Sequence, residues 1–200
     1  MVVPCLKIWL TIDPRDQKLA CVALCRQAVL CHTCRCHHAS IHKLSSLLWE
    51  ELLDCCRPLE DVKEFGITLE EFVCLADCNG AVASFVRPSD TKEQFDQFVQ
   101  TVERVCTGGR QGKEENLDEE NPDEFMAISF SRKALGQTGD GHFSPIAAFD
   151  RETSSVLMFD TARFKYPPYW VPIELLFQSM LPLDSATAKS RGLHSLEGKT

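Results

Sequence analysis

The chain lacks the features that mark membrane, secreted or nucleic-acid-binding proteins. No run of about 18 apolar residues occurs, which excludes an ordinary membrane-spanning helix. The first residues, Met-Val-Val-Pro-Cys, do not begin a basic, apolar and cleavable leader. Positive charge is in deficit, with 21 Lys and Arg against 29 Asp and Glu and a net charge of -8, so no nucleic acid or anionic membrane is expected as a partner. We therefore expect a cytoplasmic protein.

Cysteine is abundant instead. The eleven cysteines are odd in number, and none follows Cys106. Because disulfide frameworks are typical of small secreted folds, we expect thiols that act as metal ligands or as a nucleophile. Residues 31–38, Cys-His-Thr-Cys-Arg-Cys-His-His, have a Cys-x2-Cys spacing that suits zinc or cadmium. No distant second pair follows, so an unstructured insertion is the stronger interpretation of this segment.

The composition and the periodicity of the sequence change along the chain. Residues 1–45 are Cys- and His-rich, residues 46–110 have helical periodicity, and a β pattern starts at Phe125. Residues 108–124 hold seven carboxylates and two basic residues, as a solvated loop does. The residues from Ser185 onward are expected to fray. We expect helices over 46–56, 68–78 with a Thr68–Glu71 capping box, 89–106 and 170–181, and strands over 81–86, 125–130, 142–149 and 154–160. Helices followed by an antiparallel sheet predict an α+β domain of 200 residues.

The last two strands predict a contact between a histidine and an aspartate. Residues 150–153, Asp-Arg-Glu-Thr, are a polar turn between two apolar runs. In a hairpin, paired residues are equally far from the centre of the turn, so their residue numbers have a constant sum. A turn centred at 151–152 gives a sum of 302 or 303, and the numbers of His142 and Asp160 add up to 302. A carboxylate opposite an imidazole can orient it for a nearby nucleophile. The alternative is a polar pair that closes the end of the hairpin, because a one-residue slip would reverse the facing.

Several long motifs in the chain resemble phytochelatin synthase over residues 46–192. They are Leu53-Asp54-Cys55-Cys56, Pro58-Leu59-Glu60, the segment Val73 to Ala81 (VCLADCNGA), the segment Gln137 to Ile146 (QTGDGHFSPI), the segment Phe159 to Pro172 (FDTARFKYPPYWVP) and the segment Asp184 to Gly192. The resemblance divides the chain into a divergent N-terminal segment at 1–45, a catalytic domain at 46–192 with the acidic loop inserted, and a tail at 193–200.

This resemblance implies a papain-like α+β fold with a Cys-His-Asp triad, in which His142 is the general base and Asp160 orients it. It implies transfer of γ-glutamylcysteine from glutathione, with loss of glycine, to glutathione or a phytochelatin. Heavy-metal ions such as cadmium and zinc are implied as activators or as metal–glutathione substrates, and no organic cofactor is implied. The candidate substrate-binding residues are Arg132, Gly141, Arg163 and Lys165, and the candidate metal ligands, which match family cysteines, are Cys55, Cys56, Cys74 and Cys78.

The sequence departs from the family pattern at the expected position of the nucleophilic cysteine. In the family this cysteine precedes an Ile-Asp-Pro in a Cys-Gly-Leu-Ala-like segment, but the eleven residues before Ile12-Asp13-Pro14 do not contain that motif. The usual nucleophile is therefore expected outside the sequence, and Cys5 and Cys21 are the candidate substitutes. Three functions stay open: the transferase, an inactive thiol- or metal-binding relative, and a peptidase that releases glycine from glutathione or its conjugates. The oligomeric state also stays open, a homodimer included.

Overall fold

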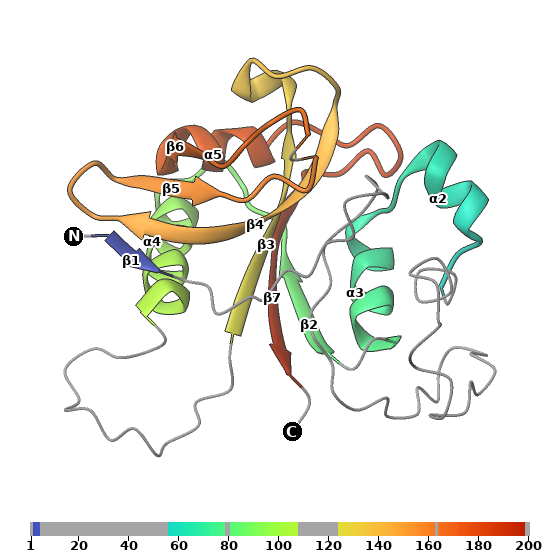
Figure 1. Ribbon diagram of the computed structural model, residues 1–200, viewed down its shortest axis with the longest axis horizontal. Coiled ribbons are helices and arrows are strands. Elements are labelled where there is room, and N and C mark those ends of the chain that lie inside the picture. Colours follow the sequence, from blue (N-terminus) through green and yellow to red (C-terminus); the bar gives the residue numbers. More distant parts are fainter. Residues whose placement is uncertain (1, 5–55, 79–80, 108–123, 163, 199–200) are drawn as a thin grey trace.

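An antiparallel sheet forms the centre of the computed structural model, which describes residues 2–4, 56–78, 81–107, 124–162 and 164–198 (Figure 1). The described strands follow the order β2-β7-β3-β4-β5-β6, and β1 also pairs with β4. The strands are β1 Val2–Pro4, β2 Ala81–Val86, β3 Glu124–Ser131, β4 Gly141–Asp150, β5 Ser155–Met158, β6 Tyr169–Pro172 and β7 Gly192–Gly198. The helices are α2 Leu59–Phe65, α3 Leu69–Cys78, α4 Lys92–Thr107 and α5 Ile173–Met180, with a 3-10 turn, η2, at Lys133–Leu135. The predicted α+β class is confirmed.

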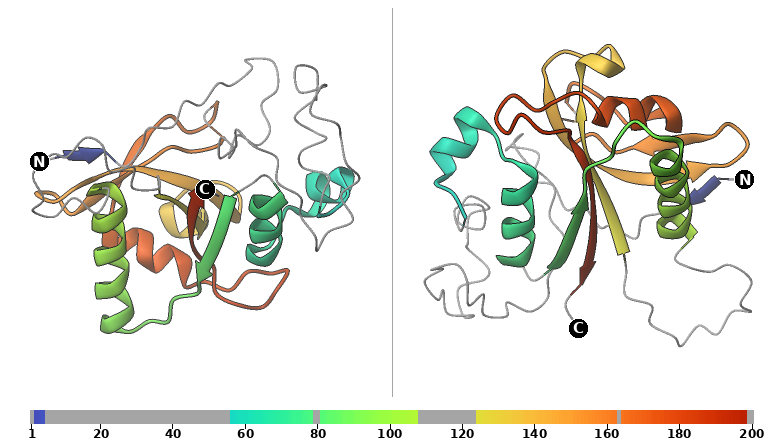
Figure 2. Two further views of the ribbon diagram at one scale, coloured as in Figure 1. Left: turned by 90° about the horizontal axis from the view of Figure 1, so that it is seen from below. Right: turned by 180° about the vertical axis from the view of Figure 1, so that it is seen from behind.

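Helices cover both faces of the sheet, as the alternation of side chains along a strand requires. Met126 and Phe130 of β3 lie in the main core, which α4 and α5 cover. Ala127, one position out of phase, lies in a second core with Phe72 of α3. The two groups of helices stand on opposite sides of the sheet in all three views (Figures 1 and 2). None of the helices in the described part of the chain is long and apolar enough to cross a bilayer.

Local sequence signals predicted several elements correctly. At the start of α3, the Thr68 N–H donates to a carboxylate oxygen of Glu71 at 2.7 Å, and the Glu71 N–H donates to the Thr68 hydroxyl at 3.2 Å. This is the predicted capping box, and it satisfies two amide groups that the helix itself leaves unpaired. β2 has the predicted bounds, and β3 and α4 differ from their predicted ranges by a few residues.

The end of the chain differs from its prediction. Residues 193–198, expected as a frayed tail, belong to β7, which lies between β2 and β3 inside the sheet. A strand that is buried on both faces lacks the polar–apolar alternation that reveals a strand in sequence. The predicted helix at 170–181 begins only at Ile173, since residues 169–172 form β6. α2 was not predicted, and most of the helix predicted over 46–56 lies outside the described residues.

His194 of β7 is fully buried among aromatic rings. Its ring stacks on Phe72 of α3 at a centroid distance of 4.2 Å, with Phe85 and Phe143 at 5.8 and 5.9 Å. Within the described part of the chain, neither ring nitrogen has a hydrogen-bond partner. Burial, and then the charge of Arg87, lower the pKa of His194 from 6.5 to about 3. The folded protein therefore holds this imidazole neutral as part of the second core.

The neutral state of His194 predicts a dependence of stability on pH. Below pH ~6.5 the unfolded chain takes up a proton at this position and the folded chain does not, so the free energy of unfolding should fall as the pH drops from 6.5 toward 3. His194→Phe, which keeps an aromatic ring in the stack, should remove about 1.4 kcal/mol per pH unit of that fall. Urea unfolding at pH 7, 6 and 5 measures it. Ser195→Ala on the same strand should leave the slope as it is, and parallel profiles for His194→Phe and the unaltered chain would contradict the assignment.

Candidate active site

His142 and Asp160 lie side by side, but the pairing that predicted their contact is wrong. The Nε2 atom of His142 is 2.9 Å from Oδ1 of Asp160. Asp150 pairs with Ser155, so the hairpin numbers sum to 305 and not to 302. His142 pairs instead with Phe130 of the neighbouring strand β3. Asp160 follows the end of β5. The chain leaves the sheet there, and its path places the Asp160 carboxylate beside the His142 ring.

Four donors hold the Asp160 carboxylate, whose side chain is fully buried. Oδ1 accepts hydrogen bonds from Nε2 of His142 at 2.9 Å, from Nη2 of Arg132 at 2.8 Å and from the Ala162 N–H at 2.8 Å. Oδ2 accepts one from the Tyr169 hydroxyl at 3.3 Å. Buried charges persist when they are paired and hydrogen-bonded in this way.

The charge state of Asp160 fixes the tautomer of His142. Burial raises the pKa of Asp160, but the hydrogen bonds from His142, Arg132 and the Ala162 N–H outweigh burial and hold this pKa well below its ordinary value. An ionised carboxylate only accepts, so Nε2 of His142 carries the hydrogen. In the neutral ring Nδ1 is then a bare acceptor, and no hydrogen bond to it arises from the described residues. Nδ1 is therefore the nitrogen that can take a proton.

Thr161 gives the imidazole a second partner. Its hydroxyl donates to the Phe143 carbonyl at 3.0 Å, and its Oγ1 lies 2.9 Å from Nε2 of His142. Because the hydroxyl hydrogen is used by the carbonyl, Oγ1 can share the Nε2 hydrogen with Asp160. Phe130 packs edge-on against the same ring at 5.8 Å. The ring is therefore restrained by two acceptors and by an aromatic contact.

Arg132 connects the two loops that border the site. Its guanidinium binds Asp160, donates to the Gln137 side-chain oxygen at 2.5 Å and lies 4.6 Å from the centre of the Tyr166 ring. The Tyr166 hydroxyl accepts the Thr138 N–H at 2.9 Å, which ties the loop after η2 to the loop after Asp160. The arginine side chain is only 6% exposed. This guanidinium therefore already has a carboxylate partner, and its predicted contact with substrate stays a prediction.

The other candidate substrate residues border the same site. Gly141 begins β4 beside His142 and is exposed, and a methyl group added there would meet the Arg191 guanidinium at 3.4 Å. Lys165 is exposed on the loop after Asp160, with its Nζ 5.5 Å from the Tyr166 ring. Arg163 lies outside the described residues.

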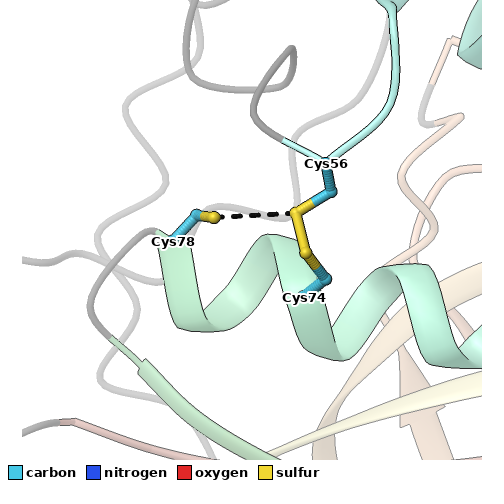
Figure 3. A group of neighbouring side chains, drawn as sticks. All are labelled: Cys56, Cys74 and Cys78. Atoms are coloured by element: carbon cyan, nitrogen blue, oxygen red, sulfur yellow. Dashed lines mark hydrogen bonds between the residues drawn. A yellow bond between two sulfur atoms is a disulfide. The ribbon is translucent and has the colours of Figure 1, made fainter. Parts of the chain in front are cut away.

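The chemical state of the described cysteines differs from the prediction. Cys56 and Cys74 form a disulfide, and Cys106 is also disulfide-bonded, so the expectation of thiols throughout is wrong. The Cys78 thiol lies 3.6 Å from the Cys56 sulfur (Figure 3). Cys5, Cys21 and Cys55 lie outside the described residues. No cysteine of the described part hydrogen-bonds to His142.

Sequence reasoning missed three contacts of the His142–Asp160 pair: those made by Thr161, by Tyr169 and by Arg132. Thr161 and Tyr169 belong to the sequence motif that contains Asp160, so both residues could be read from the sequence. Their contacts depend on the path of the loop after β5, which no periodicity reveals. Arg132 contacts Asp160 across 28 residues of sequence.

The buried Arg132–Asp160 pair predicts a large loss of stability when one partner is removed. Arg132→Met should lower the free energy of unfolding at pH 7 by about 3–5 kcal/mol, because a buried carboxylate loses its positive partner. Urea unfolding measures the loss. The control is Arg151→Met, which breaks a more exposed pair with Glu103 and should cost less than about 1 kcal/mol. Equal losses in the two variants would show that burial does not set the strength of the inner pair.

Comparison with known proteins identifies the family. A phytochelatin synthase family profile matches residues 13–193. The glutathione gamma-glutamylcysteinyltransferase of Schizosaccharomyces pombe is 44% identical over 146 residues, which are 73% of this chain and 32% of that protein. Glutathione gamma-glutamylcysteinyltransferase 1 of Arabidopsis thaliana is 43% identical over 144 residues, or 72% of this chain and 26% of that protein. The chain thus spans a third or less of the length of these relatives, and it belongs to the phytochelatin synthase family.

Proposed function

We propose that the chain is a glutathione gamma-glutamylcysteinyltransferase that uses a Cys-His-Asp mechanism on a papain-like fold. The observation that carries this proposal is the His142–Asp160 pair, in which an ionised, buried carboxylate holds the Nε2 hydrogen and leaves Nδ1 as a base. The names of the relatives point to the same reaction. The antiparallel sheet with helices on both faces is compatible with a papain-like fold.

In the first half-reaction, His142 activates a cysteine. Nδ1 takes the thiol proton, and the thiolate attacks the carbonyl carbon of the bond between cysteine and glycine in glutathione. Asp160 stabilises the imidazolium that forms, because its carboxylate is already in place before the charge appears. The imidazolium then returns the proton to the glycine nitrogen as the C–N bond breaks. Glycine leaves, and γ-glutamylcysteine stays on the enzyme as a thioester.

In the second half-reaction, the α-amino group of another glutathione resolves the thioester. His142 takes a proton from this amine as the nitrogen attacks the acyl carbon, and the proton passes to the cysteine sulfur when the C–S bond breaks. The product has one more γ-Glu-Cys unit than the acceptor. Water in place of the amine would release γ-glutamylcysteine, so the transferase must favour the amine over water.

Positive charge near the site supports an anionic substrate. The chain as a whole is acidic, but Lys165 is exposed beside the site, whereas the nearby Arg191 is already paired with Asp140. The two carboxylates of glutathione, free or bound to a metal through its thiol, would be attracted to Lys165 and to Arg163. Heavy-metal ions such as cadmium enter this proposal as part of a metal–glutathione substrate or as activators.

The nucleophile decides whether this chain can act by itself. Cys5 and Cys21 are the candidates within it, and the family motif is not found before Ile12. Product from the chain alone would show that one of its own cysteines serves, and Cys5→Ser and Cys21→Ser would then identify which.

The proposal predicts the product of incubating the purified chain with glutathione and cadmium chloride. Mass spectrometry should detect peptides of the (γ-Glu-Cys)n-Gly type, and His142→Ala should lower their rate of formation by at least about 100-fold, because general base catalysis is lost. His38→Ala, the same substitution in the Cys- and His-rich segment, is the matched control and should leave the rate unchanged.

Other products contradict the transferase. Free γ-glutamylcysteine and glycine without longer peptides would show a peptidase. No product from glutathione with cadmium, although the protein is folded by circular dichroism, would show an inactive thiol- or metal-binding relative.

A further inference from the structure

Four side chains beside the candidate site form a closed ring of hydrogen bonds: Arg132, Gln137, Tyr169 and Asp160. Nη1 of Arg132 donates to the Gln137 side-chain oxygen at 2.5 Å, and Nη2 donates to Oδ1 of Asp160 at 2.8 Å. The Tyr169 hydroxyl donates to Oδ2 of Asp160 at 3.3 Å. The Gln137 side chain also hydrogen-bonds to Tyr169, and this contact closes the ring.

The turn after β3 places Gln137 beside Arg132. The chain makes the 3-10 turn η2 there, and Gly136 follows with a φ of 68°, a left-handed conformation that glycine adopts without a steric penalty. The Gln137 N–H then donates to the Arg132 carbonyl at 2.9 Å. The backbone thus turns back on itself and brings the Gln137 side chain to the guanidinium of the residue that began the turn.

The pairing of β5 with β6 places Tyr169 beside Asp160. Met158 of β5 pairs with Tyr169, and Asp160 is two residues beyond Met158. The partly buried Tyr169 also packs against the larger core, which holds its ring in place. The ring of hydrogen bonds therefore joins three segments that are separate in sequence: the turn after β3, the loop after β5 and the start of β6.

The chemistry of the four groups gives the ring one direction. A guanidinium only donates, so the Gln137 oxygen faces Arg132 and the Gln137 amide nitrogen is left to donate to the Tyr169 oxygen. The Tyr169 hydrogen is then directed at Asp160, which is ionised and only accepts. Burial and the charge of Asp160 outweigh the hydrogen bond from Gln137 and raise the pKa of Tyr169 to about 12, so Tyr169 keeps the hydrogen that it donates.

We propose that Gln137 and Tyr169 are positioning residues, which act through Asp160 on the base His142. This inference rests on the proposed function, since it assigns the two residues a task in the same reaction. Tyr169 holds Oδ2, and Gln137 directs the Tyr169 hydrogen toward it. Because Oδ2 is held, the carboxylate does not rotate about its Cβ–Cγ bond, a torsion that is otherwise soft, and Oδ1 stays beside Nε2 of His142. The imidazole thus keeps the tautomer in which Nδ1 can take a proton.

NMR of the histidine ring nitrogens tests this assignment in the full chain without any transfer reaction. At pH ~8, where an ordinary imidazole is neutral, two-bond ¹H–¹⁵N spectra of the histidine-labelled chain distinguish the two tautomers. His142→Ala identifies the His142 signals among those of the six histidines. Tyr169→Phe should move the Nδ1 resonance toward the position of a protonated nitrogen and the Nε2 resonance the opposite way, because the carboxylate that selects the tautomer is no longer held.

Tyr166→Phe is the matched control, because Tyr166 is the second of the two tyrosines in the chain and its hydroxyl bonds to Thr138. It should leave both His142 resonances in place. An unshifted spectrum of Tyr169→Phe would overturn the proposal, and so would an equal shift in Tyr166→Phe.

Substitutions of Gln137 test the direction of the ring. Gln137→Glu keeps an oxygen for Arg132 but has no hydrogen for Tyr169, so the Tyr169 hydroxyl can turn to residue 137 and release Oδ2. It should shift the His142 resonances as Gln137→Met does. Because Gln137 acts through Tyr169, Gln137→Met should add nothing to the shift in the Tyr169→Phe chain, and additive shifts would overturn the role of Gln137. Gln137 is only partly buried, so its variants test the ring even if Tyr169→Phe does not fold.

Kinetics then separate this proposal from the transferase. Where the chain forms phytochelatin, Tyr169→Phe should lower kcat about tenfold, or about 1.4 kcal/mol of barrier. KM should stay within about twofold, because the orientation of the base matters in the transition state and not in binding. A rise in KM at constant kcat would overturn the positioning role. A chain that shows the tautomer shifts and forms no phytochelatin would support the ring and refute the transferase alone.

Discussion

A single buried carboxylate, Asp160, organises the candidate site. Its charge is favourable in the interior only because donors from separate segments converge on it: Arg132 at the end of β3, His142 on β4, the Ala162 amide and Tyr169 at the start of β6. The same carboxylate fixes which nitrogen of His142 carries hydrogen. In the proposed mechanism Asp160 must be ionised, and the contacts that pair its buried charge are the same ones that keep it ionised.

The two faces of the sheet hold different clusters of side chains. The face under α4 and α5 holds the larger apolar core, and Phe130 of this core packs edge-on against the His142 ring. The opposite face holds the smaller aromatic cluster around His194, and through Phe72 it leads to the cysteines of α3. The strand β4, which holds His142, contributes to both faces, with Phe143 on the side of α3.

Predictions from sequence succeeded where a few neighbouring residues decide the outcome. The Thr68–Glu71 capping box, the bounds of β2 and the α+β class depend on contacts within a turn of helix or on one strand's composition. The predictions failed where contacts between segments distant in sequence decide the structure. β7 lies inside the sheet, and its leucines enter both cores, Leu193 the larger and Leu196 the smaller, so its residues carried no alternating pattern. The hairpin turn was misplaced by about a residue: it occupies residues 151–154 and ends at Ser154 with a φ of 48°, a left-handed conformation that the residue type does not reveal.

The sequence by itself determined the family, through long motifs in fixed order, and it predicted that His142 and Asp160 lie side by side. Those conclusions needed only residue types and their spacing. The tertiary structure alone decided how the pair meets and what surrounds it, since the Arg132–Asp160 contact spans 28 residues and the Cys56–Cys74 disulfide spans 18. Contacts of that range depend on where a loop leaves the sheet and how a helix packs on it. Both are set by burial over the whole domain and not by any local pattern.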